Sequence, residues 1–333
     1  MNKIHFWIKN ARDIALPQSI TPAILTIAMT ASLPDFSWWL SLIAVFGIAC
    51  AHLGMNLADD YFDYKQDTTR IRKQVIDEGG KTHMEKCHYL LSGEATTRDL
   101  AIAFSTFLAI AGCAGIVIFI FRGWMIALFA VLGLLIGISY SGGPLKLGYR
   151  GFGELTIGLM FGPLLMMGMS VATAGTIHAD VVLISIGMGF LVTNIGYVHS
   201  IMDIRTDTLS CRKSFAVIVK SNTAMLVALE IFAFIPFAII IGGIITGLLH
   251  WCCIFTMVLV PLTIYLIYAT KCFLDKKEIP IEPRWWMGPM GDFEMYRKYD
   301  MDWFLLRWLV ARNIVMFFSI ILTICYIILT IFN

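Results

Sequence analysis

Residues 37–67 read SWWLSLIAVFGIACAHLGMNLADDYFDYKQD, an apolar run that ends in an acidic cluster. The apolar part is long enough to cross a bilayer as a helix, which takes roughly 17–25 residues. If the helix continues into the cluster, four polar residues share one of its faces. They are Asn56, Asp60, Asp63 and Asp67. Because ionisable groups at a membrane edge are costly and usually functional, this stretch predicts a membrane helix that ends in a functional site.

A second acidic cluster, His199-Ser-Ile-Met-Asp203-Ile-Arg-Thr-Asp207, ends another apolar run. A single Asp-rich segment of this kind is more often a solvated loop, but two matching clusters favour a site. Carboxylate and amide oxygens suit hard cations such as Mg²⁺, which often bridge to substrate phosphates. The clusters therefore predict a Mg²⁺ cage with the ligands Asn56, Asp60, Asp63, Asp67, Asp203 and Asp207.

The composition indicates a membrane protein. The chain has 333 residues, of which 58% are hydrophobic and 14% charged, whereas soluble domains average about 25% charged residues. Nine apolar runs can each span a bilayer, which leaves no room for a separate soluble domain. We therefore predict one all-α membrane domain over 1–333, with spans at about 15–33, 37–58, 99–121, 123–140, 152–174, 179–200, 222–247, 250–272 and 304–331.

The distribution of Lys and Arg predicts the orientation. With nine spans, all of the 25 Lys and Arg residues except Arg122 fall on one side or at its helix ends. The positive-inside rule places that side, with both acidic clusters, in the cytoplasm. The net charge of +2 gives no indication of a nucleic-acid partner. We expect a multi-pass protein of the cell (inner) membrane, with cytoplasmic loops 59–98, 141–151, 201–221 and 274–302.

The two clusters also indicate an internal repeat. Each ends a span, the second and the sixth, and each is followed by a polar loop with basic residues. Both clusters face the same side, so the duplication is parallel. Internal repeats are common in membrane proteins, with sites at the repeat interface. Two four-helix halves with a ninth helix appended describe the pattern.

Carboxylates and cations together at a membrane surface suit the chemistry of a diphosphate. Carboxylates hold Mg²⁺, the metal neutralises phosphate oxygens, and basic side chains cancel the remaining charge. If the other end of the diphosphate is an isoprenoid, its departure leaves an allylic cation that an electron-rich acceptor can capture. An apolar tunnel between the helices would then house the prenyl tail. The alternative from another class is a transporter with a carboxylate site. Transport sites usually lie near the bilayer midplane, so clusters at helix ends favour the enzyme.

Three further features carry no settled chemistry. His52 and His199 lie four residues before the motif residues Asn56 and Asp203. Each histidine can either form a hydrogen bond to a residue of the site or serve only in packing between helices. The polar loop 274–302 contains Trp285, Trp286, Met287 and Met290. Such a mixture suits a segment that lies on the bilayer surface or caps a cavity.

Four segments carry a family resemblance: ARDIALPQSITP (11–22), NLADDYFD (56–63), YSGGPLKLGYRGFGE (140–154), and Asp203–Asp207 followed by RKSFAV (212–217). In this order they resemble the UbiA superfamily of membrane prenyltransferases. Within it, they are most similar to the branch that prenylates 1,4-dihydroxy-2-naphthoate in menaquinone biosynthesis. The resemblance implies nine helices around a central cavity and Mg²⁺-dependent prenyl transfer.

The resemblance also implies roles for individual residues. Asn56, Asp60, Asp63, Asp203 and Asp207 would bind Mg²⁺–diphosphate, and Tyr140 would lie near the prenyl cation or the acceptor. The candidate substrate-binding residues are Asn56, Arg12, Lys146, Arg150, Arg212, Lys213 and His199. The implied substrates are a prenyl diphosphate and an aromatic acceptor, with the lipid bilayer as surroundings.

Several positions depart from the pattern of this branch. His199 and Ser200 stand where its second motif has Asn-Asn, Cys211 replaces a Gly, Ser214 replaces a Thr, and Asp13 replaces a Pro. The metal ligands are unchanged, so these differences bear on the acceptor. The acceptor expected from the resemblance is 1,4-dihydroxy-2-naphthoate. The alternatives are 4-hydroxybenzoate or a specialised phenol.

Overall fold

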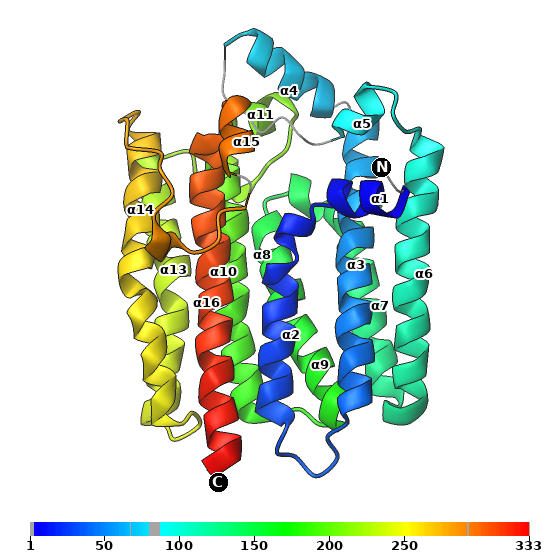
Figure 1. Cartoon of the computed structure of the whole chain (residues 1–333). Helices are drawn as coiled ribbons and strands as arrows, with labels where there is room; N and C mark the ends of the chain where they lie inside the picture. The colour runs from blue at the N-terminus through cyan, green and yellow to red at the C-terminus, as the bar shows by residue number, and fades with distance from the viewer. Residues whose placement is uncertain (1–2, 67, 80–86, 292, 333) are drawn as a thin grey trace.

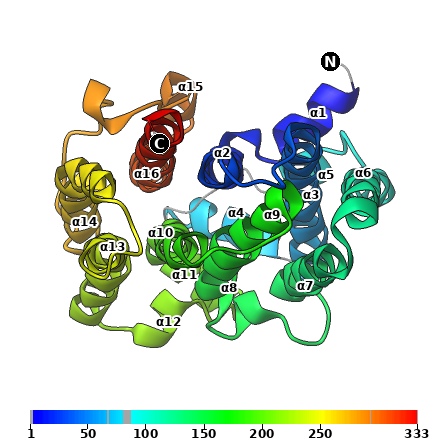
Figure 2. The same cartoon turned by 90° about the horizontal axis from the view of Figure 1, so that it is seen from below.

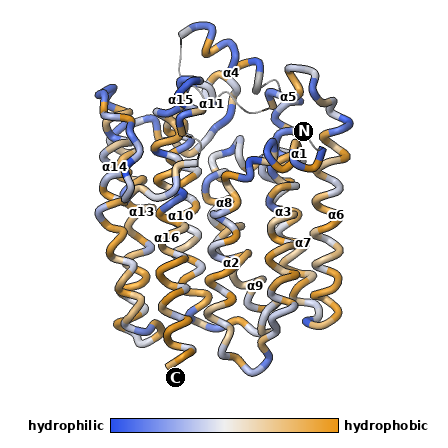
Figure 3. Tube along the Cα trace, in the orientation of Figure 1, coloured by the Kyte–Doolittle hydropathy of each residue, from blue (hydrophilic) through white to orange (hydrophobic). Residues whose placement is uncertain are grey.

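A computed structural model of the chain describes residues 3–66, 68–79, 87–291 and 293–332. The long helices run roughly parallel to one axis, and short helices collect at one end of the bundle (Figure 1). Hydrophobic residues dominate the long helices, whereas hydrophilic segments gather at the end with the short helices (Figure 3). In the described ranges the only β-structure is an isolated parallel bridge between Arg150 and Lys213.

Eight described helices are long and apolar enough to cross a membrane. Their bounds agree with eight of the predicted spans to within a few residues. The exception is the helix predicted over 37–58, which continues to Lys65. An all-α, multi-pass membrane fold is therefore confirmed. The eight are α3 (Trp38–Lys65), α6 (Thr97–Arg122), α7 (Trp124–Ser141), Gly153–Ala174, α10 (Ala179–Met202), α13 (Asn222–Ile245), Trp251–Leu274 and α16 (Asp302–Phe332). Gly153–Ala174 comprises α8 (Gly153–Leu159), η3 (Met160–Leu164) and α9 (Leu165–Ala174), and Trp251–Leu274 comprises η4 (Trp251–Leu259) and α14 (Val260–Leu274).

The first predicted span is a shorter helix, α2 (Pro17–Thr30), of 14 residues. It follows the 3-10 turn η1 (Asp13–Ala15) and lies alongside α3 and α16 (Figure 2). Pro17 occupies the first turn, where its missing N–H costs no hydrogen bond. At about 1.5 Å per residue, α2 is about 21 Å long, less than the roughly 30 Å of a hydrocarbon core.

Short helices cover the polar end of the bundle. They connect the long helices, and Figure 1 shows α4 and α11 at this end of the bundle. Their bounds are α1 (Lys3–Asn10), α4 (Thr68–Asp77), α5 (His88–Leu91), η2 (Leu147–Tyr149), α11 (Ile204–Leu209), α12 (Phe215–Val219), η5 (Trp285–Met287) and α15 (Phe293–Lys298).

A π-helical turn and close glycine packing shape the Gly153–Ala174 crossing. Pro163 lies inside the turn η3, and because proline lacks the N–H that an α-helix needs, the wider turn accommodates it. A Cβ added at Gly162 would lie only 2.4 Å from the backbone nitrogen of Gly189 on α10, and one at Gly158 would lie 2.4 Å from the Gly189 carbonyl oxygen. Small residues at these positions therefore allow α8–η3 and α10 to approach closely, a common device in membrane bundles.

The loop between α14 and α16 folds inward. Met287 and Met290 are buried, whereas Trp285 is 92% exposed. Arg312 of α16 donates to the carbonyl oxygens of Pro289 (2.6 Å) and Ile14 (2.9 Å), and the Asn313 amide donates to the Met287 carbonyl oxygen at 2.7 Å. These bonds tie the loop and the turn η1, just before α2, to the last helix.

Candidate active site

The first acidic motif lies on the last turns of α3, which continues beyond the apolar run to Lys65. Asp60 and Asp63 are almost fully buried. The Asn56 amide donates to the Ala11 carbonyl oxygen at 2.9 Å, and Arg12 Nη2 donates to the Asn56 carbonyl oxygen at 2.8 Å. This exchange of hydrogen bonds fixes the N-terminal segment beside the motif.

Arg12 also lies beside two carboxylates of the motif. Its Nη2 is 3.2 Å from Asp60 Oδ1 and 3.4 Å from Asp59 Oδ2. On the other side of Asp60, the Tyr89 hydroxyl donates to Oδ2 at 3.1 Å, and the Ser141 hydroxyl donates to Asp59 Oδ1. Asp59 and Asp60 are thus held by donors from three separate parts of the chain.

Asp63 contacts the loop that follows the second motif. Arg212 Nη1 lies 3.5 Å from Asp63 Oδ2, and Tyr149 donates to Asp63 Oδ1 at 3.0 Å. Arg212 Nη2 donates to the Tyr140 hydroxyl at 2.9 Å, and its guanidinium lies 5.5 and 5.3 Å from the ring centroids of Tyr140 and Tyr149. Arg212 therefore links the first motif to the loop 140–149.

The second motif lies where α10 ends. Asp203 follows the last residue of α10, and the Asp207 N–H donates to the Asp203 carbonyl oxygen at 2.8 Å, so the two acids are one turn apart. Asp203 Oδ2 is 3.1 Å from His199 Nε2 and 3.5 Å from Arg72 Nη2. Arg72 comes from α4 and is 3% exposed, and neither its Nε nor its Nη1 has a hydrogen-bond partner among the described residues.

The charges at the site reflect both burial and neighbours. Burial raises the pKa of Asp207, Arg212 offsets part of that rise, and the Asp203 carboxylate adds to it. Burial alone would lower the pKa of Arg212, but Tyr140, Asp63 and Asp207 outweigh burial and raise it. Burial likewise opposes the charge of Arg12, but Asp60 and Asp59 raise its pKa. Both guanidinium groups therefore stay charged.

Glu154, at the start of α8, joins three elements behind the second motif. Its Oε1 accepts hydrogen bonds from the Ser200 hydroxyl (2.5 Å) and the Phe215 N–H (3.0 Å). Ser200 lies on α10, and Phe215 begins α12, three residues after Arg212. This contact therefore helps to position the Arg212 loop.

The other predicted basic residues lie on the exposed surface around the site. Lys146 is exposed and donates to Gln66 Oε1 at 3.3 Å, and Arg150 is exposed and donates to the Pro144 carbonyl oxygen at 3.1 Å. Lys213 is exposed and takes part in the bridge with Arg150. Asp67 lies outside the described residues, so its predicted place among the metal ligands has no structural counterpart here.

The donor set fits magnesium held together with a substrate phosphate. Within the described ranges, no three His, Cys, Asp or Glu side chains form a group that could hold a metal ion by themselves. Mg²⁺, however, is usually bound by one or two carboxylates together with substrate phosphates and water. Buried carboxylates from two motifs with arginines beside them supply this combination.

Several contacts were not predicted from the sequence. Arg72, Tyr89, Tyr149 and Ser141 bind the motif carboxylates, yet none has a distinctive spacing from them in the chain. Tyr149 and Ser141 do lie within the resembling segment 140–154, which was the available signal. Arg72 and Tyr89 lie in the long polar loop after α3, where the sequence offers no indication of which residue turns inward.

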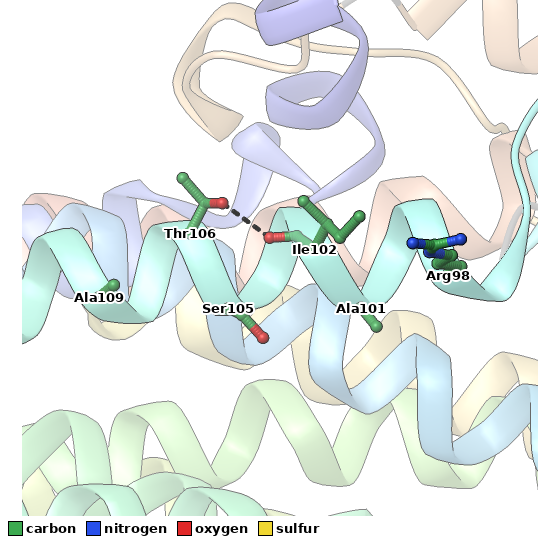
Figure 4. Close-up of a pocket in the computed structure, with 6 residues that line it drawn as sticks. All are labelled: Arg98, Ala101, Ile102, Ser105, Thr106 and Ala109. Atoms are coloured by element: carbon green, nitrogen blue, oxygen red, sulfur yellow. Dashed lines mark hydrogen bonds between the residues drawn. The ribbon is translucent and has the colours of Figure 1, made fainter.

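A shallow hollow on the outer face of α6 is separate from this site. Figure 4 shows its lining residues on one helix, where the Thr106 hydroxyl donates to the Ile102 carbonyl oxygen at 2.8 Å. The other lining residues are Arg98, Ala101, Ser105 and Ala109. None of these is a residue of the acidic motifs, so the hollow has no part in the chemistry derived below.

Comparison with known families decides what this arrangement is. The model of the UbiA prenyltransferase family matches residues 19–287. The chain belongs to this family. It is therefore a prenyltransferase, and the transporter hypothesis is set aside.

Curated relatives and solved structures extend this comparison. The chain is 29% identical over 212 residues to the 1,4-dihydroxy-2-naphthoate octaprenyltransferase of Mycobacterium tuberculosis, covering 63% of this chain and 68% of that one. It is 26% identical over 236 residues to the enzyme of the same name from Bacillus subtilis, covering 71% and 72%. Its fold is similar to a UbiA homolog from Archaeoglobus fulgidus bound to GPP and Mg²⁺, with a TM-score of 0.64, 14% identity, and coverage of 96% of this chain and 99% of that one.

Proposed function

We propose that this UbiA-family enzyme transfers a polyprenyl group from a prenyl diphosphate to 1,4-dihydroxy-2-naphthoate, in menaquinone biosynthesis. The observation that carries the proposal is that arginine side chains contact buried carboxylates of both motifs at one end of an apolar bundle. Arg72, which is buried, lies beside Asp203, and Arg212, which is half-buried, lies beside Asp63. The acceptor is taken from the names of the mycobacterial and Bacillus relatives.

The carboxylates would hold Mg²⁺ together with the diphosphate. The proposed ligands are Asn56, Asp60, Asp63, Asp67, Asp203 and Asp207, and the Mg²⁺ found in the A. fulgidus homolog supports this metal. Magnesium on the diphosphate would neutralise its oxygens and make it a better leaving group. The protein's part is to present oxygen donors from two helices to one phosphate group.

The arginines would bind diphosphate once the carboxylates turn to the metal. Arg12 and Arg212 each pair with a motif carboxylate, and Arg72 Nε and Nη1 lack partners among the described residues. A planar guanidinium suits paired phosphate oxygens, so these three side chains could each donate to a charged leaving group. Lys146, Arg150 and Lys213 on the exposed surface around the site would attract the incoming diphosphate from solution.

Tyr140 would lie beside the reacting carbon. Its hydroxyl is held by Arg212, which fixes the ring near the diphosphate site. An aromatic face attracts a cation, so the ring would stabilise the prenyl cation as the C–O bond to diphosphate breaks. A ring carbon of the acceptor then bonds to the prenyl carbon, and the acceptor carboxylate leaves as CO₂. His199, bonded to Asp203, would border the acceptor.

We further propose the overall arrangement in the membrane. The short helix α2 would be a ninth crossing, and the chain would form one domain of two related four-helix halves with α16 appended. The Lys and Arg distribution supports a cytoplasmic active site in the cell (inner) membrane. On this arrangement the prenyl tail extends from the polar end into the bundle and the lipid.

Product analysis tests the proposal. Purified protein in lipid nanodiscs would receive Mg²⁺, prenyl diphosphates of several lengths, and either 1,4-dihydroxy-2-naphthoate or 4-hydroxybenzoate. We expect a prenylated, decarboxylated naphthalenediol, identified by mass. If only 4-hydroxybenzoate yields a prenylated product, 4-hydroxybenzoate replaces 1,4-dihydroxy-2-naphthoate as the proposed acceptor. Release of diphosphate without any prenylated aromatic product would overturn the proposal. Omission of Mg²⁺ with added EDTA is the matched control.

A further inference from the structure

A cavity of about 700 Å³ lies at the polar end of the bundle, between the end of α14, the loop that follows it and the start of α16. Figure 1 shows this loop in orange, with α15 beside α16. None of the described lining residues belongs to the acidic motifs, so the cavity is separate from the candidate active site. Its basic lining residues are Lys276, Lys277, Arg297 and Arg307.

Arg307 is the buried member of this basic set. It lies on α16 and is 3% exposed. Its Nε donates to the Ala269 carbonyl oxygen at 2.9 Å, and its Nη1 donates to the Trp303 carbonyl oxygen at 2.5 Å. Its Nη2 forms no hydrogen bond with any described residue. Two neutral acceptors therefore fix the guanidinium, and Nη2 remains as a donor for a molecule in the cavity.

No carboxylate of the described residues forms a salt bridge with Arg307. The cavity does contain acidic residues, but two of them pair with other arginines. Asp302 lies 3.5 Å from Arg297 Nε, and Glu282 lies 3.4 Å from Arg284 Nη2. A buried charge without a counter-ion is unfavourable, so a buried arginine that lines a cavity favours an anion there.

The length of α16 places this cavity at the depth of lipid headgroups. The helix has 31 residues, which at about 1.5 Å per residue is about 46 Å, against roughly 30 Å for a hydrocarbon core. Its far end is apolar up to Phe332, so the extra length lies at the polar end (Figure 3). Arg307, about 7 Å along the helix from Asp302, then lies outside the hydrocarbon core.

The lining also suits a ligand that has an apolar part. The rings of Phe273 and Trp303 stack with their centroids 5.5 Å apart, and Ile279 and Ile281 line the cavity as well. A guanidinium donates well to phosphate oxygens, and lysines add positive charge beside it. A phosphate carried by an amphipathic molecule matches both kinds of surface.

We propose that this cavity is a binding site for an anionic phosphate group, with Arg307 as its buried donor and the exposed Lys276 and Lys277 beside it. Two sources carry this chemistry, the headgroup of an anionic membrane lipid and phosphate in solution. The depth of the cavity and its apolar lining favour the lipid. The inference does not depend on the proposed function, because it concerns residues outside the acidic motifs.

The test measures lipid binding directly. Purified full-length protein in detergent would be titrated with dioctanoyl phosphatidylglycerol, and bound molecules would be counted by native mass spectrometry. Dioctanoyl phosphatidylcholine, with the same chains and no net charge, is the comparison lipid. We expect one phosphatidylglycerol to bind at concentrations at which phosphatidylcholine does not.

Variants of the lining residues locate the bound lipid. Arg307→Gln removes the charge but keeps an amide donor, and it should raise the Kd for phosphatidylglycerol at least about tenfold, since charged hydrogen bonds contribute at least that factor. The double variant Lys276→Gln, Lys277→Gln should raise the Kd a few-fold. The matched control is Lys298→Gln, at an exposed residue of α15 that does not line the cavity, with Kd expected unchanged.

Inorganic phosphate distinguishes the two sources. If phosphate alone raises the Tm of the wild type but not of Arg307→Gln, and also displaces the lipid, the site is supported and its ligand comes from solution. Equal binding of the two lipids, or an unchanged Kd in Arg307→Gln, overturns the proposal. If Arg307→Gln lowers the Tm without any ligand, the lysine variant decides, and an unchanged Kd there overturns the proposal.

Discussion

Arg212 Nη1 lies 3.5 Å from Asp63 Oδ2, joining the loop after the second acidic motif to the helix that carries the first. Arg212 is half-buried, and it also donates to Tyr140. One side chain thus connects both motifs to the aromatic ring proposed to face the prenyl cation. Substitution of Arg212 should therefore slow the loss of diphosphate from the prenyl donor rather than weaken binding of the donor.

We expect Arg212→Met and Lys146→Met to change different kinetic constants. Arg212→Met should lower kcat even when the prenyl diphosphate is saturating, because the lost charge acts on the departing group. Lys146 is exposed and bonds only Gln66 among the contacts described, so Lys146→Met should raise KM and leave kcat nearly unchanged. Steady-state kinetics with varied donor concentration distinguishes the two. An unchanged kcat for Arg212→Met would restrict Arg212 to docking.

Both acidic motifs should be necessary for turnover. Asp60→Asn or Asp207→Asn keeps the side-chain volume and removes one charged oxygen donor. We expect a loss in rate of at least about a hundredfold, equivalent to about 2.7 kcal/mol of transition-state stabilisation. Asp77→Asn, at an exposed position of α4, is the control. Near-normal activity of either motif variant, with Mg²⁺ as the added metal, would contradict a site shared between the motifs.

The raised pKa of Asp207 predicts a metal-dependent loss of activity in acid. Protonation neutralises the carboxylate, and because burial raises the pKa of Asp207, this happens at a higher pH than for an exposed Asp. Activity should fall as pH falls through that pKa. Since Mg²⁺ competes with the proton, raising the Mg²⁺ concentration should shift the decline to lower pH. Rate profiles that superimpose at two Mg²⁺ concentrations would speak against this competition.

Glycine packing between η3 and α10 should limit substitution at Gly162. Gly162→Ala would place a Cβ 2.4 Å from the Gly189 backbone nitrogen, and backbone atoms cannot move aside as a side chain does. We expect destabilisation of about 1–3 kcal/mol, measured as a lower Tm in detergent. Gly112→Ala, on α6 with no atom within 4 Å of the added Cβ, should leave Tm unchanged or slightly higher. Equal effects of the two substitutions would rule out close packing as the cause.

The hydrogen bonds of Arg312 should contribute strongly to stability. Arg312→Met would leave the carbonyl oxygens of Ile14 and Pro289 without this donor in a buried region. Hydrogen bonds to charged groups contribute about 1.5–3 kcal/mol, so we expect a clear decrease in Tm. Arg205→Met, which breaks the exposed pair with Glu78, should change stability by less than about 1 kcal/mol. A Tm for Arg312→Met equal to that of Arg205→Met would refute this role.

The long helices could be predicted from the sequence because each is set by a local pattern. An apolar run of sufficient length must satisfy its backbone within the membrane, and a helix is the local way to do so. The capping box of Thr96 and Asp99 starts α6 by equally local means. The π turn at Pro163 and the 14-residue length of α2 did not follow from the apolar pattern, because that pattern gives the approximate extent of a span but not its helix type or its exact ends.

The site was only partly predictable for a related reason. Helical spacing was enough to place Asp60 and Asp63 on one buried side of α3. The partners Arg72 and Tyr89 depend on how the polar loop after α3 folds back over the bundle, which no local spacing determines. The exposed positions of Lys146 and Lys213 show the same limit, because a basic residue in the right loop can still point outward.

The bond from Arg312 to the Ile14 carbonyl oxygen bears on the order in which the protein assembles. The two residues lie 298 positions apart, so ribosomal synthesis of almost the entire polypeptide separates the appearance of donor and acceptor. During insertion, the turn η1, which precedes α2, is therefore in place before the helix that finally binds it has been made. The N-terminal segment and α16 therefore enter the membrane one after the other. The contact between them can form only at the end of synthesis. Translation that stops before α16 would leave the N-terminal segment, with Arg12, without that anchor.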